Sequence, residues 1–385
     1  MTTYFIFAGE ASGDLHGSHL IQAMQTQKSP VIRGVGGPRM RQENFECFLP
    51  MEEFQVMGFS DVIRSLPHLL KLFYQVRNFI LKTKPDCVIL IDYPGFNLRL
   101  AQSLRKKGFK GKLVQYICPT VWAHGKKRIE TLNNHYDLLL TIYPFEADYF
   151  SHTKLKVEYI GNPLAETIRA HAYQSDWKAQ MKLPIEKDLI ALFPGSRFGE
   201  IQKHAPQQLK IASELKERYP NLHFALSCAQ ESMHELLLNL IQQGPLRLNQ
   251  DIHIIPPHAH YDLMNTCNTA LAKSGTVTLE LALHSVPAIV HYELSALNYF
   301  FAKYMLKLNL PHYCIVNILG KQKIFPEFLG RHLSTDQMRD NLKEIHFNTT
   351  QREHIQQACE KIKEQLGSKS SHQYAAQLIQ ELMKC

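Results

Sequence analysis

The chain has 385 residues, which exceeds the usual size of a single hydrophobic core, so two domains are expected. Hydrophobic residues make up 45% of the chain and charged residues 20%, a composition that excludes an intrinsically disordered protein. The 43 Lys and Arg against 35 Asp and Glu give a formal charge of +8. That charge suits an anionic ligand or an anionic membrane surface, although many enzymes that bind neither are equally basic.

The sequence shows no recognisable targeting or membrane-spanning segment. The first apolar run, residues 4–8, is too short for a signal peptide and is predicted to be a strand. No apolar stretch is long enough to cross a bilayer. The eight cysteines are scattered and form no C-x-x-C pair, which favours a reducing compartment. We therefore expect a cytoplasmic protein.

The first half alternates short apolar runs with helical patterns. Near-continuous apolar runs are typical of strands buried on both faces of a parallel sheet. A helix is predicted to begin near Asp14, and apolar residues recur at helical spacing between Leu69 and Ile80. The predicted strands of this half lie near residues 3–7, 31–32, 87–91, 113–117 and 138–142.

The second half repeats the same alternation after Gly161-Asn162-Pro163. From about Ser334 onward the pattern is helical and charged, with no further strand signal. The predicted class is α/β, with two Rossmann-like domains facing a cleft and a helical C-terminal segment. We predict the domains to be residues 1–165 and 166–385. The predicted strands of the second half lie near residues 189–193, 222–226, 252–255, 270–272 and 288–290.

Two turns of the first half are candidate binding sites, because open α/β sheets bind ligands at the carboxyl ends of their strands. The turn after the first strand carries Glu10, Ser12 and Asp14 among glycines. Its alternative interpretation is a tight turn with an aspartate helix cap. Asp92 ends the apolar run 87–91, where a partly desolvated carboxylate could act as a general base. The alternative for Asp92 is a turn-forming or capping role.

Two turns of the second half have a pattern suited to phosphate. Ser196 and Arg197 follow the strand at 189–193 and offer a backbone amide and a guanidinium fork. Ser274-Gly275-Thr276 opens a helix after a strand, which predicts an anion site for a diphosphate. Glu280, about one turn later, is placed to bind a ribose hydroxyl pair. The alternatives are a surface arginine and an ordinary capped helix.

Several other site classes are excluded by missing motifs. His234-Glu235 lacks the second histidine of a zinc-protease helix, and no P-loop appears. The dinucleotide fingerprint G-x-G-x-x-G is absent, and the chain contains no D-x-D. We expect no metal, no cofactor and no nucleic-acid partner.

One region of the first half suits a lipid surface. The apolar residues 54–59 precede an amphipathic segment at 66–81 that includes Lys71 and Arg77. Further basic clusters lie at 105–107 and 126–128. Apolar side chains beside basic ones are typical of a segment that lies on a bilayer. The alternative is a core-packing helix with a solvated basic face.

Taken in order, these motifs resemble the lipid-A-disaccharide synthase family, glycosyltransferases of the GT-B architecture. The chain departs from the family pattern at Gly95, where a second aspartate is frequent, and at His124, where tryptophan is common. The motifs that carry the resemblance, over most of the chain, are residues 8–14, 34–38, 56–59, 91–97, 119–123, 144–146, 194–197, 274–276 with 280, 317–319 and 326–327.

The resemblance implies a reaction and roles for these residues. UDP-2,3-diacylglucosamine would donate its sugar, with inversion, to the 6-hydroxyl of 2,3-diacylglucosamine 1-phosphate, giving a β-1,6 disaccharide and UDP. Asp92 would remove the acceptor proton, with Glu10 as a second catalytic carboxylate. The substrates would be bound by Ser12, Asp14, Ser196, Arg197, Ser274, Gly275, Thr276, Glu280 and Asn317.

The resemblance also implies a setting for the reaction. The enzyme would lie peripherally on the inner face of the cytoplasmic membrane. A homodimer is possible in this family, and the sequence does not decide whether the C-terminal tails are exchanged between its two chains. The nearest alternative is another GT-B sugar-nucleotide transferase, or a UDP-sugar epimerase, acting on a soluble substrate. A two-domain dehydrogenase lacks its fingerprint here, and a non-catalytic membrane scaffold would release no UDP.

Overall fold

The computed structural model describes residues 2–25, 30–54, 59–184, 186, 188–294 and 311–384, with only the backbone of 59–65, 123, 124 and 126. Its contacts divide the chain into two compact units. The first comprises Met1–Glu166 and Leu366–Cys385, and the second comprises Thr167–Gln365. The expected boundary at 165/166 lies one residue from the first crossing. The tail differs from expectation, because residues 366–385 belong to the first unit rather than to the second domain.

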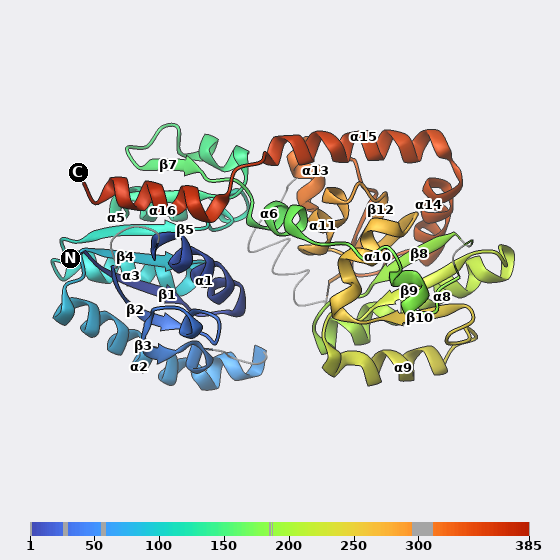
Figure 1. Cartoon of the computed structure of the whole chain (residues 1–385), viewed down its shortest axis with the longest axis horizontal. Coiled ribbons are helices and arrows are strands. Elements are labelled where there is room, and N and C mark those ends of the chain that lie inside the picture. Colours follow the sequence, from blue (N-terminus) through green and yellow to red (C-terminus); the bar gives the residue numbers. More distant parts are fainter. Residues whose placement is uncertain are drawn as a thin grey trace. The chain divides into compact units, whose positions relative to one another are not determined.

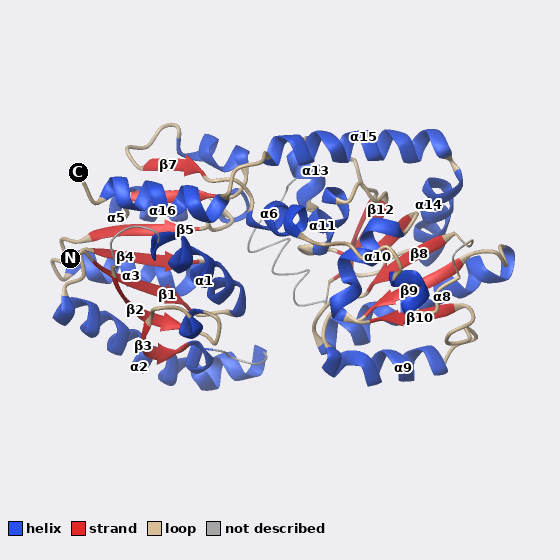
Figure 2. Ribbon diagram, viewed as in Figure 1, coloured by secondary structure: helices blue, strands red, loops and turns tan. Residues whose placement is uncertain are grey.

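The first unit is a parallel seven-stranded sheet with helices on both faces (Figures 1 and 2). The strand order is β3-β2-β1-β4-β5-β6-β7. Its strands are β1 (Thr3–Ala8), β2 (Val31–Gly36), β3 (Glu46–Pro50), β4 (Cys87–Ile91), β5 (Lys112–Tyr116), β6 (Leu138–Thr141) and β7 (Lys156–Tyr159). Its helices are α1 (Ala11–Gln25), α2 (Phe59–Thr83), α3 (Pro94–Lys106), α4 (Val121–His124), α5 (Lys126–His135) and α16 (Ser371–Leu382). Helix α6 (Pro163–Ala170) begins in this unit and ends in the second.

Alternate residues of β1 serve the two faces of this sheet. Tyr4, Ile6 and Ala8 belong to one buried cluster, in which side chains of α1 and α16 also pack. Phe5 and Phe7 belong to the cluster on the other face, which includes side chains of α2, α3 and α5. Because both faces are covered, every position of the strand must be apolar, which explains the unbroken run in the sequence.

The second unit is a parallel six-stranded sheet, also covered by helices. The strand order is β10-β9-β8-β11-β12-β13. Its strands are β8 (Leu189–Phe193), β9 (His223–Ser227), β10 (Ile252–Ile255), β11 (Thr269–Lys273), β12 (Ala288–Glu293) and β13 (Glu327–Gly330). Its helices are α7 (Trp177–Gln180), α8 (Phe198–Arg218), α9 (His234–Gln242), α10 (His260–Thr266), α11 (Val277–Leu283), α13 (Ile315–Gly320), α14 (Thr335–Phe347) and α15 (Thr349–Leu366).

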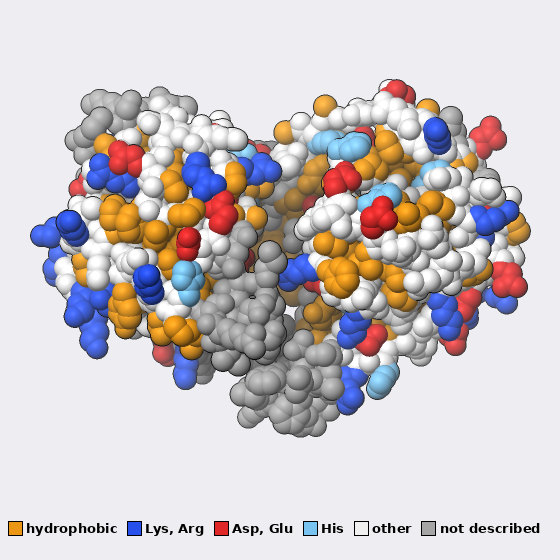
Figure 3. Space-filling view, turned by 90° about the horizontal axis from the view of Figure 1, so that it is seen from below, with side chains coloured by type: hydrophobic (Ala, Val, Ile, Leu, Met, Phe, Trp, Pro, Cys, Tyr) orange, Lys and Arg blue, Asp and Glu red, His pale blue; other side chains and the backbone are white. Residues whose placement is uncertain are grey.

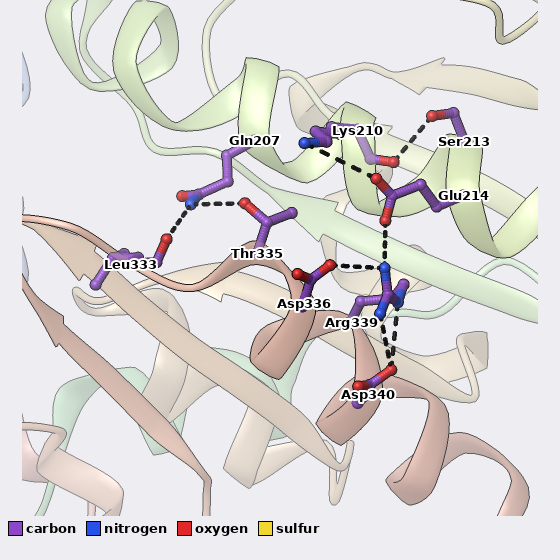
Figure 4. Close-up of polar contacts among 9 residues, drawn as sticks. All are labelled: Gln207, Lys210, Ser213, Glu214, Leu333, Thr335, Asp336, Arg339 and Asp340. Carbon is purple, nitrogen blue, oxygen red and sulfur yellow. Dashed lines mark hydrogen bonds and ion pairs between the residues drawn. The ribbon is translucent and has the colours of Figure 1, made fainter.

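A network around Arg339 fastens α14 to α8 in the second unit (Figure 4). The Arg339 guanidinium lies 2.8 Å from the carboxylate of Glu214 on α8 and 2.9 Å from that of Asp336 on its own helix. Asp340 contacts the same guanidinium at 3.2 Å. Some charged residues of the C-terminal segment therefore pair with one another and with α8 instead of facing only solvent.

The structure confirms the predicted α/β class with two Rossmann-like units and a helical C-terminal segment. Each predicted strand coincides with an observed one within a residue or two, or forms part of a longer strand. Three further strands, β3, β7 and β13, were not predicted, and all three are edge strands. The 3₁₀ turns that complete the two units do not change this architecture.

Candidate functional site

Each sheet has one place where the strand order reverses, and both places carry predicted site residues. In the first sheet β1 pairs with β4, although β2 and β3 lie between them in the chain. In the second sheet β8 pairs with β11 in the same way. The loops leaving such neighbouring strands run to opposite faces and leave a crevice at the carboxyl edge. Ligands of open α/β sheets bind there.

The first crevice brings together Ser12 and Asp92. Ala8 and Ile91, the last residues of β1 and β4, are partners in the sheet, so the turns that follow them are adjacent. The Ser12 hydroxyl donates a hydrogen bond of 3.3 Å to Oδ2 of Asp92. Asp92 is half-buried, whereas Ser12 is exposed. A carboxylate so placed is open to a substrate hydroxyl.

The backbone at Asp92 is held in an uncommon conformation. Asp92 and Tyr93 have φ values of 48° and 45°, in the left-handed region. The Asp92 N–H donates to the carbonyl of Tyr116 at 3.1 Å, and the Asn97 amide donates to the Asp92 carbonyl. Such backbone costs on the order of 1–3 kcal/mol and persists where the surroundings impose it, often at functional sites. The contacts to Tyr116 and Asn97 hold the backbone from which the Asp92 side chain projects.

Glu10 and Tyr93 complete this crevice. Glu10 is exposed and follows β1. Burial, followed by the negative charge of Glu10, raises the pKa of Tyr93. The Tyr93 ring stacks on that of Phe7 at 6.2 Å between centroids, and its hydroxyl donates to the Phe54 carbonyl at 3.3 Å. Glu10 is thus close to Tyr93, the residue after Asp92, and adds negative charge to the same crevice.

Asp14 occupies a different place from the one expected of a substrate-binding residue. Its side chain is buried, and its carboxylate accepts the backbone N–H groups of Gly37 at 2.8 Å, Arg39 at 3.0 Å and Met40 at 3.1 Å. These bonds fix the loop after β2 against α1. The prediction that Asp14 touches the substrate is therefore corrected to a structural role.

The second crevice is a pocket of about 650 Å³ within the second unit. It holds most of the residues predicted to bind the donor, namely Ser196, Arg197, Gly275, Thr276 and Glu280. Ser274 is not part of its lining, and its backbone N–H donates to the carbonyl of His291 at 2.8 Å. The other lining residues are His171, Phe193, Gly195, Glu200, Ser227, Ala229, Pro257, His258, His260, Tyr261, Lys273 and Val277.

The loop between β8 and α8 presents a cation at the pocket. Arg197 is the N-cap residue of α8, and its side chain is 84% exposed. Gly195 has a φ of +121°, and an added Cβ would lie 2.8 Å from Cβ and Oε2 of Glu200, so this position requires glycine. The Arg197 guanidinium makes a loose ion pair with Glu200 at 3.9 Å and can reorient towards a bound anion, while the backbone beneath it is fixed.

The loop after β11 presents backbone and hydroxyl groups to the same pocket. Gly275 and Thr276 are exposed, and the Thr276 side chain makes no capping hydrogen bond to α11. Within the first turn, the Thr278 hydroxyl bonds the Gly275 carbonyl at 2.8 Å. The Thr276 hydroxyl is thus available to a ligand, and its predicted contact with a diphosphate stays a prediction.

Glu280 lies deeper, among polar side chains that the sequence did not reveal. Its carboxylate is 3.5 Å from both Nε2 of His260 and the hydroxyl of Tyr261. Nδ1 of His260 in turn lies 2.9 Å from the hydroxyl of the buried Ser227. Burial, and then the Glu280 carboxylate, raises the pKa of Tyr261. These neighbours keep Glu280 oriented into the pocket.

Asn317 lies apart from the pocket and is fully buried. Its side-chain oxygen accepts the N–H groups of Ile324 and Phe325, each at 2.8 Å, and its amide donates to the Phe325 carbonyl at 2.8 Å. The prediction that Asn317 binds substrate is corrected: it closes the loop after α13.

Sequence reasoning missed Lys273, Glu200, His260 and Tyr261. Lys273 directly precedes the Ser274-Gly275-Thr276 motif, and Glu200 follows Arg197 by three residues. Their closeness to these two motifs is the sequence signal that could have identified them. His260 and Tyr261 begin α10 and belong to no recognisable pattern. Among the described residues, no group of three or more His, Cys, Asp or Glu side chains is arranged to hold a metal ion.

Comparisons with known proteins show the family to which the chain belongs. The family model described as Lipid-A-disaccharide synthetase matches residues 4–382. A lipid-A-disaccharide synthase of Chlamydia trachomatis is 42% identical over 330 residues, covering 85% of this chain and 53% of the relative. One of Geobacter sulfurreducens is 32% identical over 379 residues, covering 98% of this chain and 96% of the relative. The chain thus spans about half the length of the chlamydial relatives.

Solved structures support the fold alone. The S. aureus MnaA–UDP co-structure has a TM-score of 0.63 at 13% identity, covering 100% of this chain and 96% of that one. Acinetobacter baumannii MurG has a TM-score of 0.56 at 13% identity, covering 99% of this chain and 100% of that one. With these neighbours the fold is of the GT-B type. With the family model matched over nearly its whole length, the chain belongs to the lipid-A-disaccharide synthetase family.

Proposed function

We propose that this chain is an inverting glycosyltransferase that joins UDP-2,3-diacylglucosamine to 2,3-diacylglucosamine 1-phosphate, giving the β-1,6 disaccharide 1-phosphate and UDP. Family membership supports a role in lipid A synthesis. The observation that carries the proposal is the pocket at the β8/β11 crevice, which combines Arg197, Thr276 and Glu280. Those groups match the parts of a nucleoside diphosphate.

The donor would bind through its diphosphate and its ribose. Arg197 can donate in a fork to phosphate oxygens, and the exposed Gly275-Thr276 turn adds backbone and hydroxyl donors. Glu280, buttressed by His260 and Tyr261, would accept hydrogen bonds from the ribose hydroxyls. Donors that face the diphosphate stabilise the negative charge that grows on it as it leaves.

The acceptor would meet Asp92 in the first unit. The carboxylate would take the proton of the 6-hydroxyl as that oxygen attacks the anomeric carbon. A single displacement of an α-linked donor gives a β-linked product, so no covalent sugar–enzyme intermediate is needed. Ser12 holds one oxygen of Asp92, which leaves the other for the acceptor. Glu10 adds negative charge near a developing oxocarbenium ion.

The acyl chains of both substrates require access to a lipid surface. Helix α2 has an exposed face that could contact such a surface. Leu66, Leu70 and Tyr74 lie at helical spacing on this helix and are 51%, 48% and 49% exposed. Lys71 is exposed beside them, and Arg77 lies over the Tyr74 ring at 4.7 Å. Figure 3 views the side of α2 and shows hydrophobic side chains next to Lys and Arg on the first unit.

This exposed stripe supports peripheral attachment to the inner face of the cytoplasmic membrane, because apolar and basic side chains together suit anionic headgroups. Among the described residues, no helix has the length and apolar character needed to cross a bilayer. The apolar segment at 55–58 and the Lys126 side chain, both expected to contribute, lie outside the described residues. A homodimer with exchanged tails would reuse the contacts of α16 with α1.

The test is UDP release from UDP-2,3-diacylglucosamine in detergent and EDTA, with and without 2,3-diacylglucosamine 1-phosphate. Release that depends on the acceptor is expected, together with a disaccharide product of β configuration. Release without acceptor, or none at all, would contradict the proposal. Turnover of a deacylated donor at the same rate would favour the alternative, a GT-B enzyme acting on a soluble substrate.

A further inference from the structure

The wall of the donor pocket contains an ion pair that the proposed reaction has not used. Lys273 is the last residue of β11, and its Nζ lies 3.0 Å from Oε1 of Glu200 in the first turn of α8. Both side chains are mostly buried, with 14% and 19% of their surface exposed, and both line the pocket. The pair connects the end of β11 to the first turn of α8, the helix that follows β8.

Glu200 contacts the same hydrogen-bond donors and cations that a bound phosphate would contact. Its Oε2 accepts the Ser196 N–H at 3.2 Å, and the Arg197 guanidinium lies 3.9 Å from Oε1. An ammonium, a backbone amide and a guanidinium thus converge on one carboxylate. Burial alone would raise the pKa of Glu200, but the bond to Lys273 and its charge bring the pKa below its usual value, so the carboxylate is ionised.

A lysine in this position needs a counter-charge when the pocket is empty, because an unpaired buried ammonium is costly. Glu200 supplies it, and the ring of Tyr292, 5.0 Å from Nζ, supports the ammonium from another side. We propose that Lys273 is a diphosphate-binding residue, and that Glu200 is an internal counter-ion whose place at the ammonium an incoming diphosphate takes. This rests on the proposed function of the pocket.

The chemistry of transfer gives the ammonium a task. The acceptor oxygen forms a bond to the anomeric carbon, and the bond from that carbon to the β-phosphate oxygen breaks. The electron pair of the broken bond goes to UDP, while the acceptor proton goes to Asp92. Lys273 would donate hydrogen bonds to the phosphate oxygens as this charge develops, adding to Arg197.

The competing interpretation is a purely structural ion pair, and the unit contains one for comparison. Lys203 lies 3.6 Å from Glu293 and is not part of the pocket lining. Lys203→Met removes a lysine of the same unit from an ion pair and is the matched control. A structural role for Lys273 predicts that the two methionine variants behave alike.

Calorimetric titration with UDP and with uridine separates the two interpretations. Lys273→Met should weaken UDP binding about tenfold to a hundredfold, as expected for a hydrogen bond to a charged group, and should leave uridine binding unchanged. Retained uridine binding also shows that the variant is folded. Lys273→Arg should keep most of the UDP affinity, and Lys203→Met all of it.

Glu200→Gln supplies the second arm. The amide can still accept the Ser196 N–H, but the charge that competes with the diphosphate is gone, so UDP should bind at least as tightly as to the wild type. A loss as large as that of Lys273→Met would identify the pair as structural and overturn the assignment. Equal loss of UDP and uridine in Lys273→Met, or loss of neither, would overturn it as well.

These outcomes are distinct from failure of the proposed function. If the wild type binds UDP and Lys273→Met binds it equally well, only the lysine assignment fails. If the wild type shows no acceptor-dependent UDP release, the glycosyltransferase proposal fails, while the difference between UDP and uridine binding still reports on Lys273.

Discussion

The hydroxyl of Tyr116 lies 2.7 Å from Nδ1 of His372 and so joins the end of β5 to the start of α16, 256 positions later in the chain. Nε2 of the same histidine is 3.2 Å from Nδ1 of His19 on α1, and the His16 ring is 5.8 Å away. Burial, followed by the neighbouring histidines, lowers the pKa of His372 to about 4. A neutral His372 therefore holds α16 to α1 and β5.

This cluster predicts loss of stability in acid. Because the folded-state pKa of His372 is below the ordinary 6.5, the unfolded chain binds a proton that the folded chain does not as the pH falls from 6.5 towards 4. The difference in thermal midpoint between about pH 7.5 and pH 5 should shrink in His372→Gln. The exposed His234→Gln is the control and should keep the wild-type difference. An unchanged difference in His372→Gln would contradict this role of His372.

Asp92→Asn should lower the rate of transfer by about a hundredfold or more, the usual contribution of a general base. The amide is isosteric and can still accept the Ser12 hydroxyl, so folding and UDP affinity should not change. The measurement is kcat for acceptor-dependent UDP release, alongside the UDP dissociation constant. Asp148→Asn, an exposed carboxylate of the same unit, should retain full activity. Near-normal kcat in Asp92→Asn would remove Asp92 from the mechanism.

How far the sequence predicted the fold depends on burial. The runs at 87–91 and 189–193 form strands buried at every position, and their bounds were predicted to the residue. The edge strands β3 and β7 are partly exposed along their length and mix polar with apolar residues, so they lack the unbroken run. Edge strand β10 was predicted because it is mostly buried.

The candidate site shows the same division. Asp92, Arg197 and Glu280 could be proposed from the sequence because Asp92 and Arg197 follow strong strands and Glu280 lies in the first turn of a helix. Asp14 and Asn317 occur in equally conspicuous motifs, but their oxygens serve backbone N–H groups, which the sequence does not distinguish from ligand contacts. The position of α16 on the first sheet depends on contacts between distant parts of the chain, and local patterns carry no information about these.

The stripe on α2 predicts that Leu66→Ser, Leu70→Ser and Tyr74→Ser together weaken membrane attachment. The three side chains are about half exposed, so their removal should cost little stability while it removes apolar area from the lipid contact. Sedimentation with vesicles of anionic phospholipid should show the bound fraction falling several-fold, with UDP affinity unchanged. Phe347→Ser, an exposed aromatic of the second unit, is the control. Equal sedimentation of wild type and triple variant would exclude α2 as the contact.

The buried Glu146 predicts a second pH dependence, of opposite sign to that of His372. Its Oε2 accepts the N–H groups of Ile142 and Tyr143 at 3.1 and 3.0 Å, yet burial outweighs these bonds and raises the pKa to about 8. The folded chain then keeps a proton that the unfolded chain releases above 4.5, so this stability is complete below pH 4.5 and is lost as the pH rises through 8. Between about pH 5.5 and pH 7.5, the wild-type free energy of unfolding should fall relative to that of Glu146→Gln by up to about 1.4 kcal/mol per pH unit. Denaturant titrations at both pH values measure this difference. The control is Glu130→Gln at an exposed position, which should follow the wild type. Parallel behaviour of Glu146→Gln and the wild type would mean that Glu146 is ionised in the folded protein.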